Sequence, residues 1–385
     1  MRTIIALLVA LLMQGCATTA PVAPGAHAVL HDEAFGAPVA VPSAGDVFAL
    51  NAAMQDYLRT AAAPLLRQRG PQSGLVDALY SKQQLKLEYE SEKTLTAAEA
   101  FDARAGNCLS LVIMTAAFAK ELGLRVRFQV VESPDVWDRS GGLVFKIGHV
   151  NVALGGSAST LRSHNEWSNW LTVDFMPPPV KSPVHSWAID EGRVVAMYMN
   201  NRAAETLALG QAEAAYWWAR AAVLQDATFA EAFNTLGVVY QRHGRPTWAE
   251  DALRRALALQ PDNPQTLGNL ADVLASLGRT AEAGEVSARL KRLQPHAPFA
   301  YLAQGLRALR EGRFKEARDL LKKEVPLAND HHEVHFGLAL AYWHLGDSEA
   351  AASHLRKARE NSLTRQQQGL YAAKLAALRA HPTPP

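Results

Sequence analysis

The chain has 385 residues, a formal net charge of +2 and hydrophobic residues at 49% of its positions. A chain of this length is expected to form about two domains. The near-neutral charge provides no strong electrostatic field for nucleic acids or acidic substrates, so we expect no nucleic-acid partner.

Residues 1–15 have the pattern of an export signal peptide, with Arg2 as the positive charge and an apolar run from Ile4 to Met13. That run is about ten residues long, whereas a helix needs about 20 to span a bilayer. The segment therefore predicts export rather than a transmembrane helix.

The end of this signal, Leu12-Met13-Gln14-Gly15-Cys16, resembles the lipobox of bacterial lipoproteins. The resemblance implies cleavage before Cys16 and lipidation of its thiol, which would hold the protein on a membrane through acyl chains. Ala17, by the same resemblance, implies the outer membrane of a bacterial cell envelope, facing the periplasm. Ordinary signal-peptidase cleavage near Cys16 is the alternative.

Residues 16–45 are rich in Ala, Pro, Gly and Val and show little periodicity, which predicts a tether between the lipid anchor and the first domain. Helical apolar spacing follows at Phe48–Leu66 and Gly74–Leu87. These helices open a domain that we place over residues 46–195.

Thr96-Ala97-Ala98-Glu99 fits a capping box, so a short helix is predicted to begin at Thr96. A second, apolar helix is predicted over Leu109–Leu122 and ends at Gly123. Three segments with strand-like alternation come next, Arg125–Val131, Val144–Leu154 and Trp170–Phe175. Helices followed by antiparallel strands predict an α+β domain.

The C-terminal half repeats with a period of 34 residues. Glycines recur at Gly210, Gly244, Gly278, Gly312 and Gly346, and alanines at Ala215, Ala249, Ala283, Ala317 and Ala351. This period, with small residues where paired helices cross, is the signature of tetratricopeptide (TPR) repeats. We predict an all-α solenoid of five repeats over residues 196–363, then a capping helix and tail over 364–385. Such arrays bind peptides or protein partners on a concave surface.

Cys108 follows Arg104-Ala105-Gly106-Asn107 directly before the apolar helix. A helix N-terminus stabilises a thiolate, the reactive form of cysteine. With Cys16 lipidated or removed, Cys108 has no disulfide partner within the chain. A small buried structural thiol is the alternative reading.

His149 and Asp174 interrupt two of the predicted apolar strands, where a buried polar side chain is costly unless it is paired. Pairing them with each other and with Cys108 removes that cost and gives a nucleophile, a base and an orienting carboxylate. His164 and His185 are the rivals for the base. Asp174 could instead be a strand-end carboxylate.

The segment Arg104–Ser110, its apolar helix, and the order of Cys108, His149 and Asp174 resemble the bacterial transglutaminase-like superfamily. The resemblance covers about residues 75–180. It implies a papain-like core of a helix on an antiparallel sheet, with Cys108 as nucleophile, His149 as base and Asp174 as orienter. The long polar segment between His149 and Asp174 departs from the pattern. The combination with TPR repeats resembles a group of bacterial lipoproteins.

The oxyanion stabiliser is less defined. The backbone N–H of Cys108 is one natural donor, and a second could come from Asn107 or from Gln84. No cofactor is expected.

His331, His332 and His335 include a pair one helical turn apart. The HExxH order is missing and no third ligand is evident, so we expect no metal site there.

Two functions remain open from the sequence. The first is a cysteine-dependent enzyme that acts on amide bonds of a peptide or protein through a thioacyl-enzyme, with hydrolysis favoured over transamidation. The second is a non-catalytic TPR adaptor with a degenerate transglutaminase-like domain.

Overall fold

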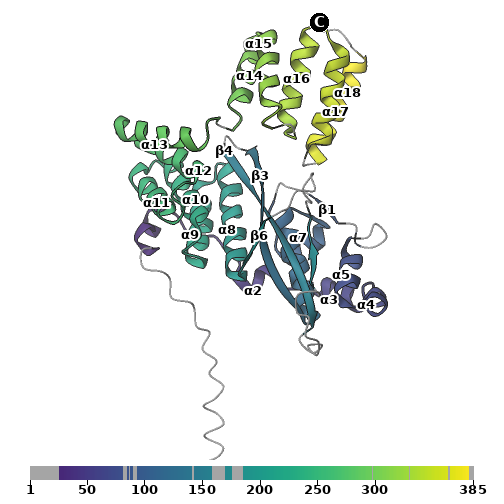
Figure 1. The fold of residues 1–385 in the computed structure, drawn as a ribbon. Helices are drawn as coiled ribbons and strands as arrows, with labels where there is room; N and C mark the ends of the chain where they lie inside the picture. Colours follow the sequence, from purple (N-terminus) through teal and green to yellow (C-terminus); the bar gives the residue numbers. More distant parts are fainter. Residues whose placement is uncertain are drawn as a thin grey trace, which may run out of the picture.

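The computed structural model (Figure 1) describes residues 26–80, 85, 87–89, 93–140, 143–157, 170–175, 185–296, 298–328, 330–362 and 365–380, with the backbone alone at 88–89, 132–140, 143–147 and 365. The signal peptide, Cys16, Gln84 and His164 lie outside this part of the chain, so the predictions for them stay predictions.

The described elements of the N-terminal half are η1 (His27–Val29), η2 (Asp32–Ala34), α2 (Ala44–Val47), α3 (Ala52–Arg59), α4 (Ala63–Arg69), α5 (Pro71–Tyr80), β1 (Glu88–Tyr89), α6 (Ala97–Ala103), β2 (Ala105–Gly106), α7 (Cys108–Glu121), β3 (Leu124–Ser140), β4 (Leu143–Ser157), β5 (Leu171–Val173) and β6 (Ser186–Ile189). The predicted capping box is present: the Thr96 hydroxyl accepts from the Glu99 N–H, and the Glu99 carboxylate accepts from the Thr96 N–H.

The remaining elements are helices: α8 (Glu191–Ala208), α9 (Ala212–Gln225), α10 (Ala230–Arg242), α11 (Pro246–Leu259), α12 (Pro264–Ser276), α13 (Thr280–Leu293), α14 (Ala300–Arg310), α15 (Phe314–Glu324), α16 (His332–His344), α17 (Ser348–Glu360) and α18 (Arg365–Ala380). The recurring glycines fall in the turns between paired helices, with φ from 73° at Gly312 to 83° at Gly346. Positive φ is tolerated best by glycine, which explains its recurrence.

The larger sheet is antiparallel, with strand order β5-β4-β3-β6. The three predicted strands correspond to β3, β4 and β5, whereas β6 was not predicted. Val131 in β3 lies opposite His149 in β4, and Val152 in β4 lies opposite Val173 in β5. The α+β class is thus observed for this region.

Helix α7 is the centre of this region. Every residue from Cys108 to Ala119 is buried, so the helix has no solvent-exposed face over that length. A helix that is apolar all round must be covered on all sides. It contacts β3 and β4 on one side and helices α5, α6 and α8 elsewhere.

The N-terminal segment differs from the tether expected over residues 16–45. Within its described part, Ala26, Val29 and Phe35 are buried against the repeats. One hydrophobic core runs from Ala26 to Ala283, across the domain boundary that we expected at residues 195 and 196. The α+β region and the first three helix pairs therefore share a core.

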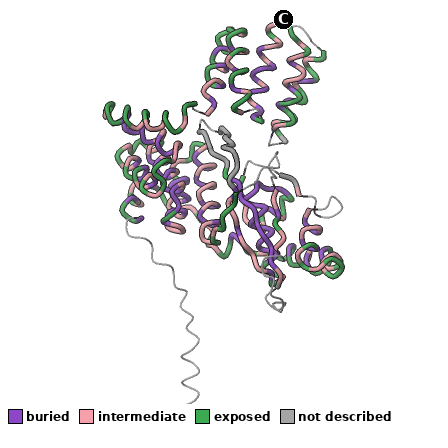
Figure 2. The backbone as a smooth tube through the Cα atoms, viewed as in Figure 1, coloured by how far each residue is buried: buried purple, intermediate pink, exposed green. Residues whose placement is uncertain are grey.

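The last five helices, α14–α18, have separate small clusters that begin at Phe299. Helix α13, which precedes them, is largely exposed (Figure 2), and Ala283 is its one buried residue. At the position where α11 buries Leu253 and α15 buries Leu321, α13 has an exposed Ser287. The repeat pattern is regular in sequence, but its core is interrupted after α13.

A substitution at Gly237 tests how closely α10 packs against α11. A Cβ there would lie 2.6 Å from Cγ of Leu253 in α11, a contact that forces one helix to shift. We expect Gly237→Ala to lower the free energy of unfolding by about 1–3 kcal/mol, in a denaturant titration.

The control is Gly284→Ala in α13, where a Cβ would meet nothing within 4 Å. Because alanine favours helix, this change should raise stability by up to about 1 kcal/mol. Equal effects of the two substitutions would contradict the packing argument.

Candidate functional site

The thiol of Cys108 lies against the backbone of β4. Cys108 is the first residue of α7 and is 7% exposed. Its Sγ lies 3.9 Å from the carbonyl oxygen of Gly148, to which it donates, and the N–H of Val150 also interacts with it. The sulfur is therefore held beside the two residues that flank His149.

His149 and Asp174 form a hydrogen-bonded pair. Nε2 of His149 lies 2.9 Å from Oδ2 of Asp174, although 25 residues separate them in sequence. The pairing of β4 with β5 brings them together, because Asp174 directly follows the last residue of β5. Nδ1 of His149 is buried and has no hydrogen-bond partner among the described residues. One ring nitrogen is thus oriented by a carboxylate and the other remains able to accept a proton.

Asn151 belongs to the same cluster, and sequence reasoning missed it. It lies two residues after His149 on β4, so both side chains are on one face of the sheet. Its Nδ2 donates to Oδ2 of Asp174 at 3.4 Å, and the residue is 6% exposed. Strand alternation from His149 was the available signal, since a polar residue at that spacing occupies the same buried face.

Burial dominates the electrostatics of the thiol. It raises the pKa of Cys108 to about 11, and the negative charge of Asp174 adds to the rise. At neutral pH the resting sulfur is therefore protonated. Reaction as a nucleophile therefore requires a base that removes this proton during attack.

The start of α7 is fixed by a buried polar network. The Asn107 Oδ1 accepts from the Ser110 N–H at 2.9 Å, which caps the helix, and its Nδ2 donates to the Thr94 hydroxyl at 2.8 Å. That hydroxyl in turn donates to Glu205 in α8 at 2.7 Å. Both ends of the Asn107 side chain are thus engaged within the fold, and its oxyanion role stays a prediction.

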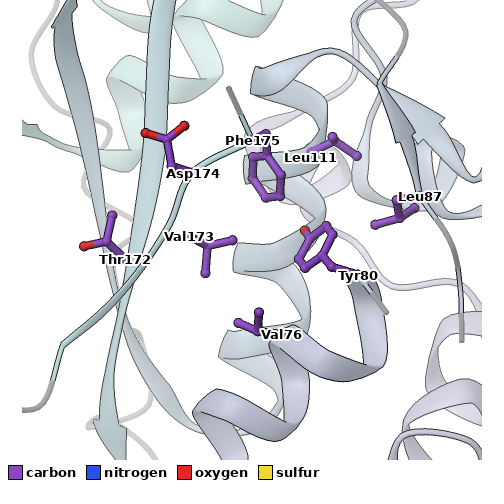
Figure 3. A pocket seen from close by; sticks show the side chains of 8 residues that line it. All are labelled: Val76, Tyr80, Leu87, Leu111, Thr172, Val173, Asp174 and Phe175. Atoms are coloured by element: carbon purple, nitrogen blue, oxygen red, sulfur yellow. The ribbon is translucent and has the colours of Figure 1, made fainter. Parts of the chain in front are cut away.

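A cavity of about 420 Å³ lies beside Asp174 (Figure 3). Its lining combines Asp174 with mostly apolar side chains: Val76, Tyr80, Leu87, Leu111, Thr172, Val173 and Phe175. Tyr80 and Phe175 place two aromatic rings there, with their centroids 5.0 Å apart. The lining favours an apolar group over a charged one.

The other histidines show no metal arrangement. Within the described ranges, no group of three or more His, Cys, Asp or Glu side chains could hold a metal ion. Nδ1 of His332 is hydrogen-bonded to the hydroxyl of Tyr371, and Nδ1 of His335 lies 3.1 Å from Nδ1 of His354. Burial, with His335 nearby, lowers the pKa of His354 to about 4. His185, a rival for the base, is exposed.

In the described part of the chain, no helix has the length and hydropathy needed to cross a bilayer.

Thr94 tests the polar network beneath the site. Thr94→Val removes the acceptor of Asn107 and one donor to Glu205, and leaves buried polar atoms unsatisfied. We expect unfolding free energy to fall by about 1–3 kcal/mol in denaturant. Thr280→Val, at an exposed position in α13, should change it by less than about 0.5 kcal/mol. An equally small effect at Thr94 would contradict a structural role for the network.

The pH dependence of alkylation tests the state of the thiol. Because the pKa of Cys108 is raised to about 11, its thiolate fraction grows throughout the range below that value. We expect the iodoacetamide rate to rise about tenfold per pH unit between about pH 7 and 10. Cys108→Ala supplies the background rate. A rate that is already level at pH 7 would show a thiolate in the resting protein.

The comparisons agree on the repeats. A tetratricopeptide repeat family model matches residues 234–298 and 302–362. Among solved structures, TTC0263, a thermophilic TPR protein of Thermus thermophilus, is 21% identical, covers 47% of this chain and 99% of its own, with a TM-score of 0.31. YrrB, titled a TPR protein with an unusual peptide-binding site, is 22% identical, covers 46% and 92%, with a TM-score of 0.26.

Pseudomonas aeruginosa pilF is 22% identical, covers 49% of this chain and 86% of its own, with a TM-score of 0.29. No curated protein matches the chain. The family match and the helix pairs together show that the C-terminal region is an all-helical TPR solenoid.

Proposed function

We propose that this chain is a lipoprotein of the bacterial envelope in which Cys108, His149 and Asp174 act on amide bonds of a peptide or protein. The TPR repeats dock the substrate or a partner. The observation that carries the proposal is the hydrogen bond of 2.9 Å between His149 and Asp174, at the strand position against which the thiol lies.

The proposed reaction begins with attack of the Cys108 sulfur on the carbonyl carbon of the amide. His149 accepts the S–H proton as the C–S bond forms, and Asp174 stabilises the resulting imidazolium. His149 then gives the proton to the leaving amine as the C–N bond breaks, which leaves a thioester on Cys108. Water, deprotonated by His149, then attacks the thioester carbonyl. As the C–S bond breaks, His149 returns that proton to the sulfur, which releases the acid and restores the thiol.

The arrangement also agrees with the transglutaminase-like resemblance. A helix with the nucleophile at its first residue packs on an antiparallel sheet, and that sheet carries the base. Hydrolysis is favoured over transamidation because water is available at an envelope surface. The apolar cavity beside Asp174 supports a substrate with an apolar side chain near the scissile bond.

A non-catalytic adaptor is the second candidate. The burial of Cys108 and its raised pKa favour it, since a protonated thiol at 7% exposure is also what a structural cysteine shows. In that case the α+β domain serves as the rigid support of the first repeats.

Labelling by a peptide that carries a thiol-reactive electrophile tests the catalytic proposal. At pH 7 the wild-type protein should be labelled, and Cys108→Ala should not. Asp174→Asn should reduce the labelling rate by about a hundredfold or more, because the imidazole loses its orientation and charge partner. The matched control, Asp56→Asn on α3, should label at the wild-type rate.

Labelling that is equal in wild type and Asp174→Asn would contradict the proposed triad. Equal activity of wild type and Cys108→Ala in a complementation assay, together with loss of activity in a TPR variant, would establish the adaptor.

A further inference from the structure

Residues 26–36 occupy an edge of the first two TPR repeats, formed by α9, the end of α10 and the start of α11. The segment contains two short turns, η1 and η2, and no longer element of its own. It is held on the repeats by side chains that contact both its backbone and its side chains.

Four side chains of the repeats bind the backbone of the segment. The Tyr216 hydroxyl accepts the His31 N–H at 3.0 Å, and the Tyr240 hydroxyl donates to the Val29 carbonyl at 2.7 Å. At Gly36, Glu213 accepts the N–H at 2.8 Å and Trp217 Nε1 donates to the carbonyl at 3.0 Å. Because these contacts are made to the backbone, they fix the position of the segment on the repeats whatever its side chains are.

Two side chains of α9 donate hydrogen bonds to the carboxylate of Asp32. Its Oδ1 accepts from the Tyr216 hydroxyl at 2.6 Å and from Nε of Arg220 at 2.7 Å. A carboxylate that accepts from a charged donor makes one of the stronger classes of hydrogen bond. The site therefore selects an acidic residue at this position.

The rings of Phe35 and His31 stack on aromatic side chains of the repeats. Phe35 is 8% exposed, and its ring lies on Tyr216 with centroids 3.8 Å apart and planes 3° apart. His31 stacks on Trp248 at 4.0 Å and 14°. Tyrosine, tryptophan and arginine are also the residues that most often dominate binding energy at protein interfaces. The edge has the composition of a recognition site.

We propose that this edge is a peptide-binding site that selects an acidic residue followed three positions later by an aromatic residue and a glycine, as in Asp32–Gly36. Residues 26–36 fill it in cis, and a partner peptide with the same pattern binds by displacing them. The inference deepens the docking role proposed for the repeats and rests on it. It is independent of the chemistry proposed for Cys108.

A short linker joins the occupant to the rest of the fold. Ala37, Pro38 and Ala40 are exposed in it, Val39 is half-buried against the core, and no regular element lies between η2 and α2. A cis segment on such a linker has an effective concentration in the millimolar range. A free peptide therefore competes poorly until the cis segment is weakened.

The test uses the full chain and a fluorescent synthetic peptide of residues 26–37. The chain variant Asp32→Asn/Phe35→Ala, with a weakened occupant, should bind the peptide at least tenfold more tightly than the wild-type chain, by fluorescence anisotropy. A peptide with the same two substitutions should bind at least tenfold more weakly than the parent peptide.

A variant of the repeat edge provides a further test. Tyr216→Phe in the weakened chain keeps the ring that stacks on Phe35 but removes the hydroxyl that contacts His31 and Asp32. It should reduce peptide affinity at least fivefold, while the helical circular dichroism stays at the wild-type level. A folded, weakened chain that fails to bind the peptide, or binds a scrambled peptide equally well, would overturn the proposal.

A second measurement keeps the proposal testable if the weakened chain does not fold. A protease site inserted between Pro38 and Val39 leaves the occupant intact and cuts it free after folding. We expect the released segment to exchange for the labelled peptide, with unlabelled peptide as competitor. A segment that stays bound without exchange, or a chain that unfolds on cleavage, would make these residues a structural strap and reject the binding site.

Because neither assay depends on the thiol, Cys108→Ala should give the same peptide affinity as its parent chain in both. If wild-type Cys108 is not labelled by the electrophile, the catalytic proposal fails and the peptide-binding result still stands. Failure of exchange with retained thiol labelling would reject the peptide site alone.

Discussion

The burial of α7 on every side is the constraint on which the rest of the structure depends. A helix that is buried on every side from Leu109 to Ala119 cannot be covered by one sheet, so it also requires helices on its other faces. One of these is α8, the first helix of the repeats. The α+β region and the repeats consequently share a core, and the Thr94–Glu205 hydrogen bond satisfies the polar start of α7 within it.

The same burial sets the chemistry available to Cys108. Exclusion of water makes the thiolate costly and raises the pKa, while the nearby carboxylate of Asp174 adds to that cost. A buried thiol at this position is useful only with a base that removes its proton at the moment of reaction. The proposed function assigns this step to the imidazole of His149, which Asp174 orients through its hydrogen bond.

Local patterns predicted much of this structure. The period of the glycines gave the helix pairs, and the alternation around His149 placed it on a strand that pairs with the strand before Asp174. Asn151 needed the strand register, and β6 and the docked N-terminal segment needed contacts distant in sequence. The prediction of a tether is wrong for residues 26–36. Composition does not reveal contacts between distant residues, such as the stacking of Phe35 on Tyr216, which is 181 positions away.

The interruption after α13 gives the repeats two different relationships to the rest of the chain. The helices up to α13 share the core with α7, so their conformation is coupled to the start of that helix through Glu205. Helices α14–α18 have only their own small clusters, which begin at Phe299. Small cores are opened at lower free energy than large ones. Local opening is therefore expected at lower free energy in α14–α18 than in the helices that share their core with α7.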